Sequence, residues 1–131
     1  MIDVAKKLRP QFLEESTGLL AGIRQFLLAV EEGRQITVGS LRKAYRCAHT
    51  LRGTSALVKL ETIRRIARLL EDTLENQLQK KQVPGRPKVE LLKRALLTLE
   101  EQLDLVRNGL EVNPNDAPEM GSEERRVGKE G

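Results

Sequence analysis

Apolar residues recur at helical spacing in four successive blocks of this 131-residue chain. The predicted buried faces are Leu8, Phe12, Leu19, Ile23, Phe26, Leu27 and Val30; then Leu41, Ala44, Cys47, Ala48, Leu51, Ser55 and Val58; then Leu60, Ile63, Ile66, Ala67, Leu70, Leu74 and Leu78; and last Val89, Leu92, Leu96, Leu99, Leu103 and Val106. Four amphipathic helices joined by short connections bury such faces most readily against one another. The pattern therefore predicts an all-α fold, an antiparallel up-down four-helix bundle with a flexible C-terminal tail.

Residues that commonly start or stop helices stand between these blocks. Gly33 and Gly109 follow the first and fourth blocks, as glycine often follows a helix end. Thr37 is suited to cap the second helix. Residues 80–88 (KKQVPGRPK) contain two prolines and a glycine, so we predict a loop there, with Pro87 opening the fourth helix.

The character of the chain changes near its C-terminus. Residues 113–131 (NPNDAPEMGSEERRVGKEG) are polar, hold prolines and glycines, and show no periodicity. Such a segment buries too little apolar area to offset the entropy lost on ordering. We therefore predict one domain over residues 1–110 and a flexible linker over residues 111–131.

Composition narrows the classes of protein that fit. No stretch approaches the roughly 18 apolar residues of a membrane span, and the N-terminus does not resemble a secretion signal, so we expect a cytoplasmic protein without membrane contact. One cysteine excludes an internal disulfide, and we expect Cys47 to be a buried thiol. One cysteine and one histidine cannot form a zinc site, and we predict no metal and no cofactor.

The net charge of +4 and the isoelectric point near 9.5 raise the question of nucleic acid. The basic residues are spread along the chain and interleaved with 19 acidic ones, and aromatic residues make up only 2%. A nucleic-acid surface would gather basic residues and aromatic platforms in one place. We therefore expect no nucleic-acid partner and interpret most charges as solvated helix faces.

The only histidine, His49, is predicted to lie on the exposed side of the second helix. On a helical wheel it falls roughly 140° from the centre of the apolar face. Its predicted neighbours on the outer surface are Tyr45 and Gly53 at one turn, Arg42 and Ala56 at two turns, and Arg46 and Arg52 to the side.

This environment suits a carrier of phosphoryl groups. A neutral imidazole is a good nucleophile near pH 7. Gly53 and Ala56 leave room for the active site of another protein, and a glycine inside a helix, which costs about 0.5–1 kcal/mol relative to alanine, needs such a reason. The arginines can donate charge-assisted hydrogen bonds to a phosphoryl group.

Residues 49–56 (HTLRGTSA) resemble the signature of histidine phosphotransfer (Hpt) domains: histidine, any residue, an apolar residue, Lys or Arg, glycine and small residues. The resemblance extends over roughly residues 1–110 and is strongest to the N-terminal phosphotransfer domain of CheA-type chemotaxis kinases. It implies that a glutamate on the next helix hydrogen-bonds the imidazole, and Glu71 in the segment 68–71 (RLLE) has the matching place. The helical wheel also puts Glu71 at a seam, about 80° from the centre of its apolar face.

The resemblance implies a role for each residue of the site. His49 would accept the phosphoryl group on Nε2, because Glu71 would accept a hydrogen bond from Nδ1–H and hold that tautomer. Arg52 would stabilise the phosphoryl group, and Gly53 would give clearance to the partner. The residues expected to contact partners are Arg42, Tyr45, Arg46, Ala56 and Arg68.

Two positions depart from the family pattern. Lys59 stands where the family commonly has glycine, which predicts a different turn between the second and third helices, or a longer continuous helix. Arg52 replaces the usual lysine, which keeps the charge and changes the donor geometry.

The implied function is that of a phosphoacceptor and relay without catalysis of its own, since the sequence lacks a glycine-rich nucleotide loop and an acidic Mg²⁺ cluster. The implied partners are the receiver domain of a response regulator and an ATP-binding histidine kinase domain, the latter in a longer protein that includes this chain. Because the histidine must be reached, we expect a monomer. Two other classes stay open: a non-catalytic helical adaptor bundle for protein–protein interaction, and a basic nucleic-acid-binding bundle.

Overall fold

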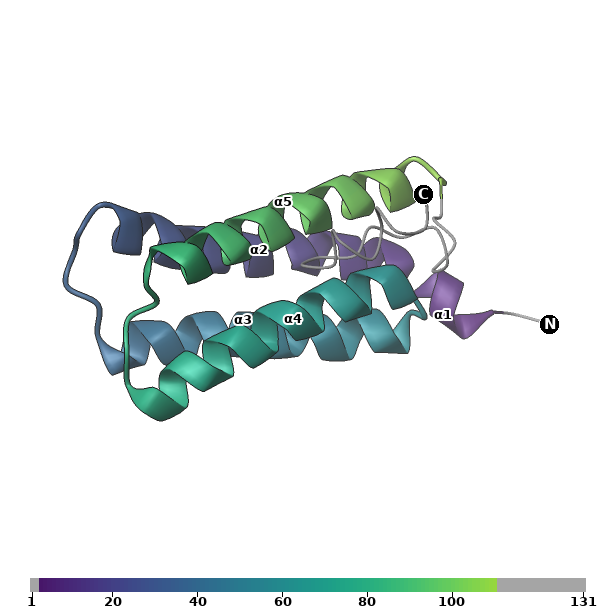
Figure 1. Cartoon of the computed structure of the whole chain (residues 1–131). Helices are drawn as coiled ribbons and strands as arrows, with labels where there is room; N and C mark the ends of the chain where they lie inside the picture. The colour runs from purple at the N-terminus through teal and green to yellow at the C-terminus, as the bar shows by residue number, and fades with distance from the viewer. Residues whose placement is uncertain (1–2, 111–131) are drawn as a thin grey trace, which may run out of the picture.

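The computed structural model describes residues 3–110, so the predicted flexible tail lies outside the described residues. The helices are α1 (Val4–Lys7), α2 (Arg9–Glu31), α3 (Val38–Leu57), α4 (Glu61–Lys80) and α5 (Arg86–Arg107). Helices α2 to α5 alternate in direction along one axis, and α1 lies at the start of α2 (Figure 1). The prediction of an all-α up-down bundle is confirmed.

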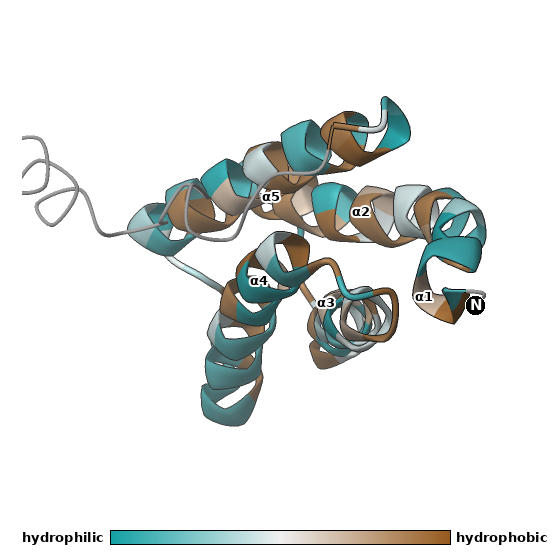
Figure 2. Cartoon of the chain, turned by 90° about the vertical axis from the view of Figure 1, so that its right-hand side faces the viewer, coloured by the Kyte–Doolittle hydropathy of each residue, from teal (hydrophilic) through white to brown (hydrophobic). Residues whose placement is uncertain are grey.

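The four long helices pack as a closed ring around one core. Contacts join α2 to α3, α3 to α4, α4 to α5, and α5 back to α2. Figure 2 looks almost end-on along α3 and shows apolar and polar sides on each long helix. The predicted faces of α3, α4 and α5 supply most of the buried residues of this core.

The burial of several residues differs from the predicted faces. Leu8 is 42% exposed because it lies at the junction of α1 and α2, whereas Leu20, absent from the predicted face, is buried. Cys47 is only partly buried, and this burial raises the pKa of its thiol. Its Sγ lies 2.8 Å from where a Cβ would stand on Gly22, so glycine permits the close approach of α2 and α3.

The sequence pattern did not predict α1. The carboxylate of Asp3 caps it by accepting a hydrogen bond from the backbone N–H of Lys6 at 3.4 Å. Pro10, in the first turn of α2, has no N–H to donate to the Lys6 carbonyl, so the helical hydrogen bonding is interrupted at this point. A single helical turn of four residues is too short to show periodicity.

The predicted helix ends are mostly in place. The Thr37 hydroxyl accepts a hydrogen bond from the backbone N–H of Ser40 at 3.0 Å and caps α3. Gly33 and Gly109 follow α2 and α5 with positive φ angles. The predicted loop over residues 80–88 is too long: Lys80 ends α4, and residues 86–88 form the first turn of α5, with Pro87 in that turn.

The turn after α3 corrects the interpretation of Lys59. The helix ends at Leu57, and Lys59 adopts the left-handed conformation (φ 58°) that glycine favours. The N–H groups of Lys59 and Leu60 donate to the carbonyls of Ala56 and Ser55 at 3.1 and 3.0 Å, which is a Schellman motif. The chain therefore keeps the turn that a glycine would make, and neither a different turn nor a longer helix results.

Candidate functional site

His49 projects from the outer side of α3. Ala48 and Leu51 beside it are fully buried and fix the rotation of the helix on the core. The side chain of His49 is therefore directed outward, with 53% of its surface exposed. This is the outward orientation that the helical wheel predicted.

Glu71, on α4, holds the imidazole from the side. Its side chain is only 9% exposed, and Leu70 and Leu74 next to it are fully buried. One carboxylate oxygen, Oε2, contacts Nδ1 of His49, and the other, Oε1, accepts a hydrogen bond from Nε of Arg52. The contact between α3 and α4 thus joins the three predicted residues in one network.

The charge of Glu71 bears on the tautomer of His49. Burial by itself raises the pKa of the Glu71 carboxyl, but the hydrogen bonds from His49 and Arg52 outweigh it, and the pKa lies below its ordinary value. The carboxylate is therefore ionised near neutral pH and can only accept hydrogen bonds. In the neutral imidazole, this contact favours the tautomer with the proton on Nδ1 and the lone pair on Nε2.

Arg52 lies between the glutamate and the histidine. Besides the hydrogen bond from its Nε to Glu71, its terminal Nη2 lies 3.4 Å from Nδ1 of His49. The residue pattern predicts that Arg52 acts on a phosphoryl group, with an ion pair between Glu71 and Arg68 or Arg52 as the alternative, and in the structure Arg52 forms that ion pair.

Tyr45 lies one helical turn before His49 and stacks on its ring. The ring centroids are 5.8 Å apart and the planes differ by 23°. The Tyr45 hydroxyl donates a hydrogen bond to Oε2 of Glu75 on α4, at 3.5 Å. Glu75 is not among the predicted site residues, although its position four residues after Glu71 on the same helix was a usable signal.

Gly53 lies one turn after His49, in the interior of α3. Apart from the backbone of its own helix, a Cβ added at Gly53 would meet no heavy atom of the described residues within 4 Å. Packing within residues 3–110 therefore does not require glycine here. Ala56, one turn further on, is exposed.

Comparison with protein families identifies the bundle. The sequence model of the Hpt domain matches residues 7–109. The chain belongs to the Hpt domain family. Comparisons with curated proteins and with solved structures find no match.

The general role of the chain follows from its membership of this family. Hpt domains are phosphotransfer carriers in phosphorelays and are not themselves catalysts; they interact with response regulators and kinases. Among the described residues, no helix is long and apolar enough to cross a membrane. The same residues contain no cluster of His, Cys, Asp and Glu suited to a metal ion.

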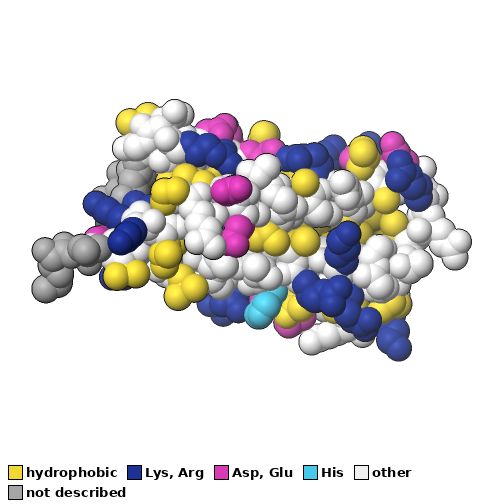
Figure 3. Space-filling view, turned by 180° about the vertical axis from the view of Figure 1, so that it is seen from behind, with side chains coloured by type: hydrophobic (Ala, Val, Ile, Leu, Met, Phe, Trp, Pro, Cys, Tyr) yellow, Lys and Arg dark blue, Asp and Glu magenta, His cyan; other side chains and the backbone are white. Residues whose placement is uncertain are grey.

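Basic side chains are frequent on the helix that carries the histidine of this Hpt domain. Helix α3 carries four arginine and lysine residues and no acidic residue. Figure 3 shows the histidine (cyan) at the surface, with basic side chains (dark blue) on both sides. Arg42 and Arg46 are exposed on α3, and Arg68 on α4 lies 3.8 Å from the carboxylate of Asp72.

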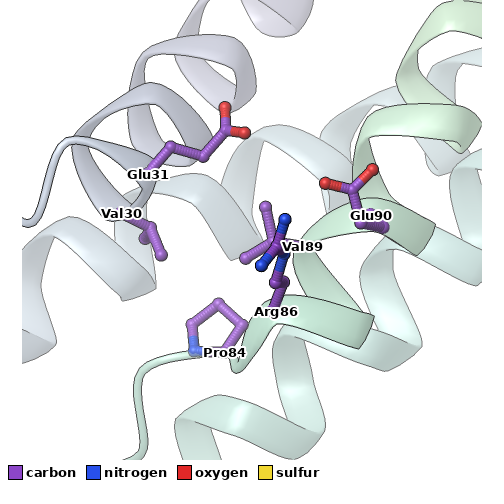
Figure 4. Close-up of a pocket in the computed structure, with 6 residues that line it drawn as sticks. All are labelled: Val30, Glu31, Pro84, Arg86, Val89 and Glu90. Carbon is purple, nitrogen blue, oxygen red and sulfur yellow. The ribbon is translucent and has the colours of Figure 1, made fainter.

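A separate cavity of about 410 Å³ lies where α2 ends and α5 begins. Val30 and Glu31 line it from α2, and Arg86, Val89 and Glu90 line it from α5, with Pro84 in the preceding loop (Figure 4). Neither histidine nor cysteine lines it. His49 and the residues that contact it are therefore not part of this cavity.

Proposed function

We propose that His49 accepts a phosphoryl group on Nε2 and passes it to the aspartate of a response-regulator receiver domain. The supporting observation is that the only histidine of this Hpt domain lies on an exposed helix face, with Nδ1 held by Glu71. A phosphohistidine carrier with one histidine has one possible acceptor.

The proposed reaction follows from the contacts of the imidazole. The Nε2 lone pair forms a bond to phosphorus while the bond from phosphorus to the donor oxygen breaks, and that oxygen leaves with its electron pair. Positive charge develops on the ring during this attack, and the Glu71 carboxylate stabilises it through Nδ1–H. In the onward transfer, a carboxylate oxygen of the receiver aspartate attacks phosphorus, the bond between phosphorus and Nε2 breaks, and the imidazole leaves as a neutral ring that keeps its Nδ1 proton.

The surrounding residues have complementary proposed roles. Arg52, anchored on Glu71, stabilises the phosphoryl oxygens with its terminal nitrogens. Gly53 and Ala56 give the partner room to approach. The remaining residues of the proposed docking surface are Arg42, Tyr45, Arg46 and Arg68.

We propose that the phosphoryl donor is an ATP-binding histidine kinase domain of the CheA type in the same longer protein. The acceptor would be a receiver domain whose own metal ion and acidic residues supply most of the catalysis. The basic face of α3 would steer an acidic receiver surface toward His49. This pathway would operate in the cytoplasm with the Hpt domain as a monomer.

The test compares the parent chain with His49→Gln in phosphoryl transfer from a CheA-type kinase domain and from a phosphorylated receiver. The parent should acquire an acid-labile label, and the variant should acquire none. An acid-stable label of equal strength on both proteins would refute the proposal and favour an adaptor role.

A second comparison tests Glu71. Glu71→Ala removes a charge-assisted hydrogen bond, whose loss corresponds to a rate decrease of about ten- to a hundredfold. An unchanged transfer rate in a folded Glu71→Ala variant would remove the role assigned to this residue.

A further inference from the structure

Tyr45 and Glu75 form a second support for the imidazole, distinct from the hydrogen bond to Glu71. We propose that Tyr45, anchored by Glu75, is a positioning residue for His49 that accelerates the phosphorylation chemistry itself. This inference rests on the proposed function of His49 and adds to the docking role of Tyr45 a role that does not depend on a partner.

The two supports constrain different motions of the ring. The contact between Nδ1 and Glu71 holds one edge of the imidazole but permits the ring to tilt about the line joining these atoms. The Tyr45 ring is stacked with the imidazole, with the centroids 5.8 Å apart and the planes 23° apart, and opposes this tilt. With both supports in place, Nε2 keeps one direction relative to α3.

Glu75 gives Tyr45 a secondary contact through the phenol hydroxyl. Burial raises the pKa of the Tyr45 hydroxyl, and the nearby carboxylates of Glu75 and Glu71 raise it further. The hydroxyl therefore keeps its proton near neutral pH and donates to Glu75. At 3.5 Å this hydrogen bond is long, so the stacked ring should contribute more than the hydroxyl.

The stack also fits the charge that develops during the reaction. As Nε2 attacks phosphorus, the ring becomes positively charged, and an aromatic face within about 6 Å attracts a cation. The contact is then stronger in the transition state than in the ground state, so it should raise the rate of the chemical step and leave binding unchanged.

A small phosphoryl donor distinguishes a role of Tyr45 in positioning His49 from a role in docking a partner protein. Phosphoramidate needs no protein partner: Nε2 attacks its phosphorus, the P–N bond breaks and ammonia leaves. Tyr45→Leu keeps apolar bulk against the core but removes the ring face. We expect Tyr45→Leu to be phosphorylated about three- to tenfold more slowly than the parent, with Tyr45→Phe close to the parent.

Two controls accompany this comparison. Thr50→Ala changes an exposed side chain of α3 next to His49 and should leave the rate unchanged. Thermal unfolding of each variant shows that the domain is folded at the assay temperature. Glu75→Ala should slow the reaction no more than Tyr45→Phe does, and the double variant should show no additional loss, because both changes remove the same hydrogen bond.

The protein also supplies its own spectroscopic signal. It has one tyrosine, no tryptophan and two weakly emitting phenylalanines, so Tyr45 dominates its ultraviolet fluorescence. Treatment with phosphoramidate should change this emission in the parent chain, because His49 is phosphorylated, and leave it unchanged in His49→Gln.

The outcomes separate this inference from the proposed function. Equal phosphoramidate rates for the parent and Tyr45→Leu, with only receiver transfer slowed, would overturn the positioning role and leave His49 as the acceptor. No phosphorylation of the parent chain would overturn both.

Discussion

Replacing Gly53 with alanine should stabilise the fold while slowing transfer to a protein partner. Gly53 lies within α3, where alanine is favoured over glycine by about 0.5–1 kcal/mol. The added methyl group would meet no atom outside its own helix backbone within 4 Å among the described residues, so no clash offsets this gain. For a domain of this size, the midpoint of thermal unfolding should rise by roughly 2–8 °C.

The same methyl group would stand one turn from His49, on the face that we propose meets the receiver. Displacing the reacting atoms by a fraction of an ångström is enough to slow transfer about tenfold or more. Phosphoramidate is small, so its reaction with His49 should keep the rate of the parent. The assays are thermal unfolding followed by circular dichroism, stopped-flow transfer to a receiver, and phosphoramidate labelling.

Gly18→Ala is the matched control. Gly18 is an exposed glycine in the interior of α2, and an added Cβ there also meets nothing within 4 Å. It should stabilise the domain by a similar amount without changing either rate. If Gly53→Ala is stabilised and still transfers to the receiver at the rate of the parent, the clearance role is wrong. If it is destabilised, the account of its packing is wrong.

Three further predictions concern the turn, the helix contact and the buried glutamate. Lys59→Gly should raise the free energy of unfolding by about 1 kcal/mol in urea titrations, because glycine adopts the positive φ angle without the steric penalty of lysine; an unchanged value would contradict this. The change in the free energy of unfolding caused by Gly22→Ala should be more favourable in a Cys47→Ala background than in the parent, since the new Cβ of residue 22 would lie 2.8 Å from Sγ of Cys47. Additive free energies in the double-mutant cycle would show that the two residues do not compete for space. The pKa of the Glu71 carboxyl is lower in the folded state than in the unfolded state, where it is near 4.3. The contribution of Glu71 to stability is therefore fully present above the unfolded-state pKa and is lost as the pH falls through the folded-state pKa. The stability difference between the parent and Glu71→Gln should therefore shrink below about pH 4 in equilibrium unfolding; a difference constant from pH 7 to pH 2 would contradict the lowered pKa.

The long helices were predictable because their burial is periodic. Fully buried residues such as Ala48, Leu51 and Leu70 recur at the spacing that brings them to one side of a helix. Helix α1 was not predictable in this way, because its four residues contain one buried side chain, Ala5. Its cap, Asp3, and its interruption by Pro10 are recognisable only once the turn is known.

The turn at Lys59 shows where residue preference fails. Lysine has no intrinsic preference for a positive φ angle, so the sequence alone favoured another geometry. Two backbone hydrogen bonds to the end of α3 and the burial of Leu60 stabilise the turn that forms. These are tertiary and capping contributions, which a residue preference does not contain.

The site was predictable in outline. The helical wheel gave the exposure of His49 and the seam position of Glu71, and the family resemblance joined them. The ion pair between Arg52 and Glu71 and the hydrogen bond from Tyr45 to Glu75 depend on side-chain conformations across the contact of α3 with α4. Such conformations are set by packing between helices, so spacing within one helix does not reveal them.

The most direct measurement of the central claim locates the phosphorus atom. The parent chain, labelled with ¹⁵N in its single histidine and phosphorylated, should show ³¹P–¹⁵N coupling to Nε2 of His49, with an Nδ1 proton still hydrogen-bonded to Glu71. Acid should remove the label. Coupling to Nδ1, or an acid-stable phosphoryl group on another residue, would contradict the account.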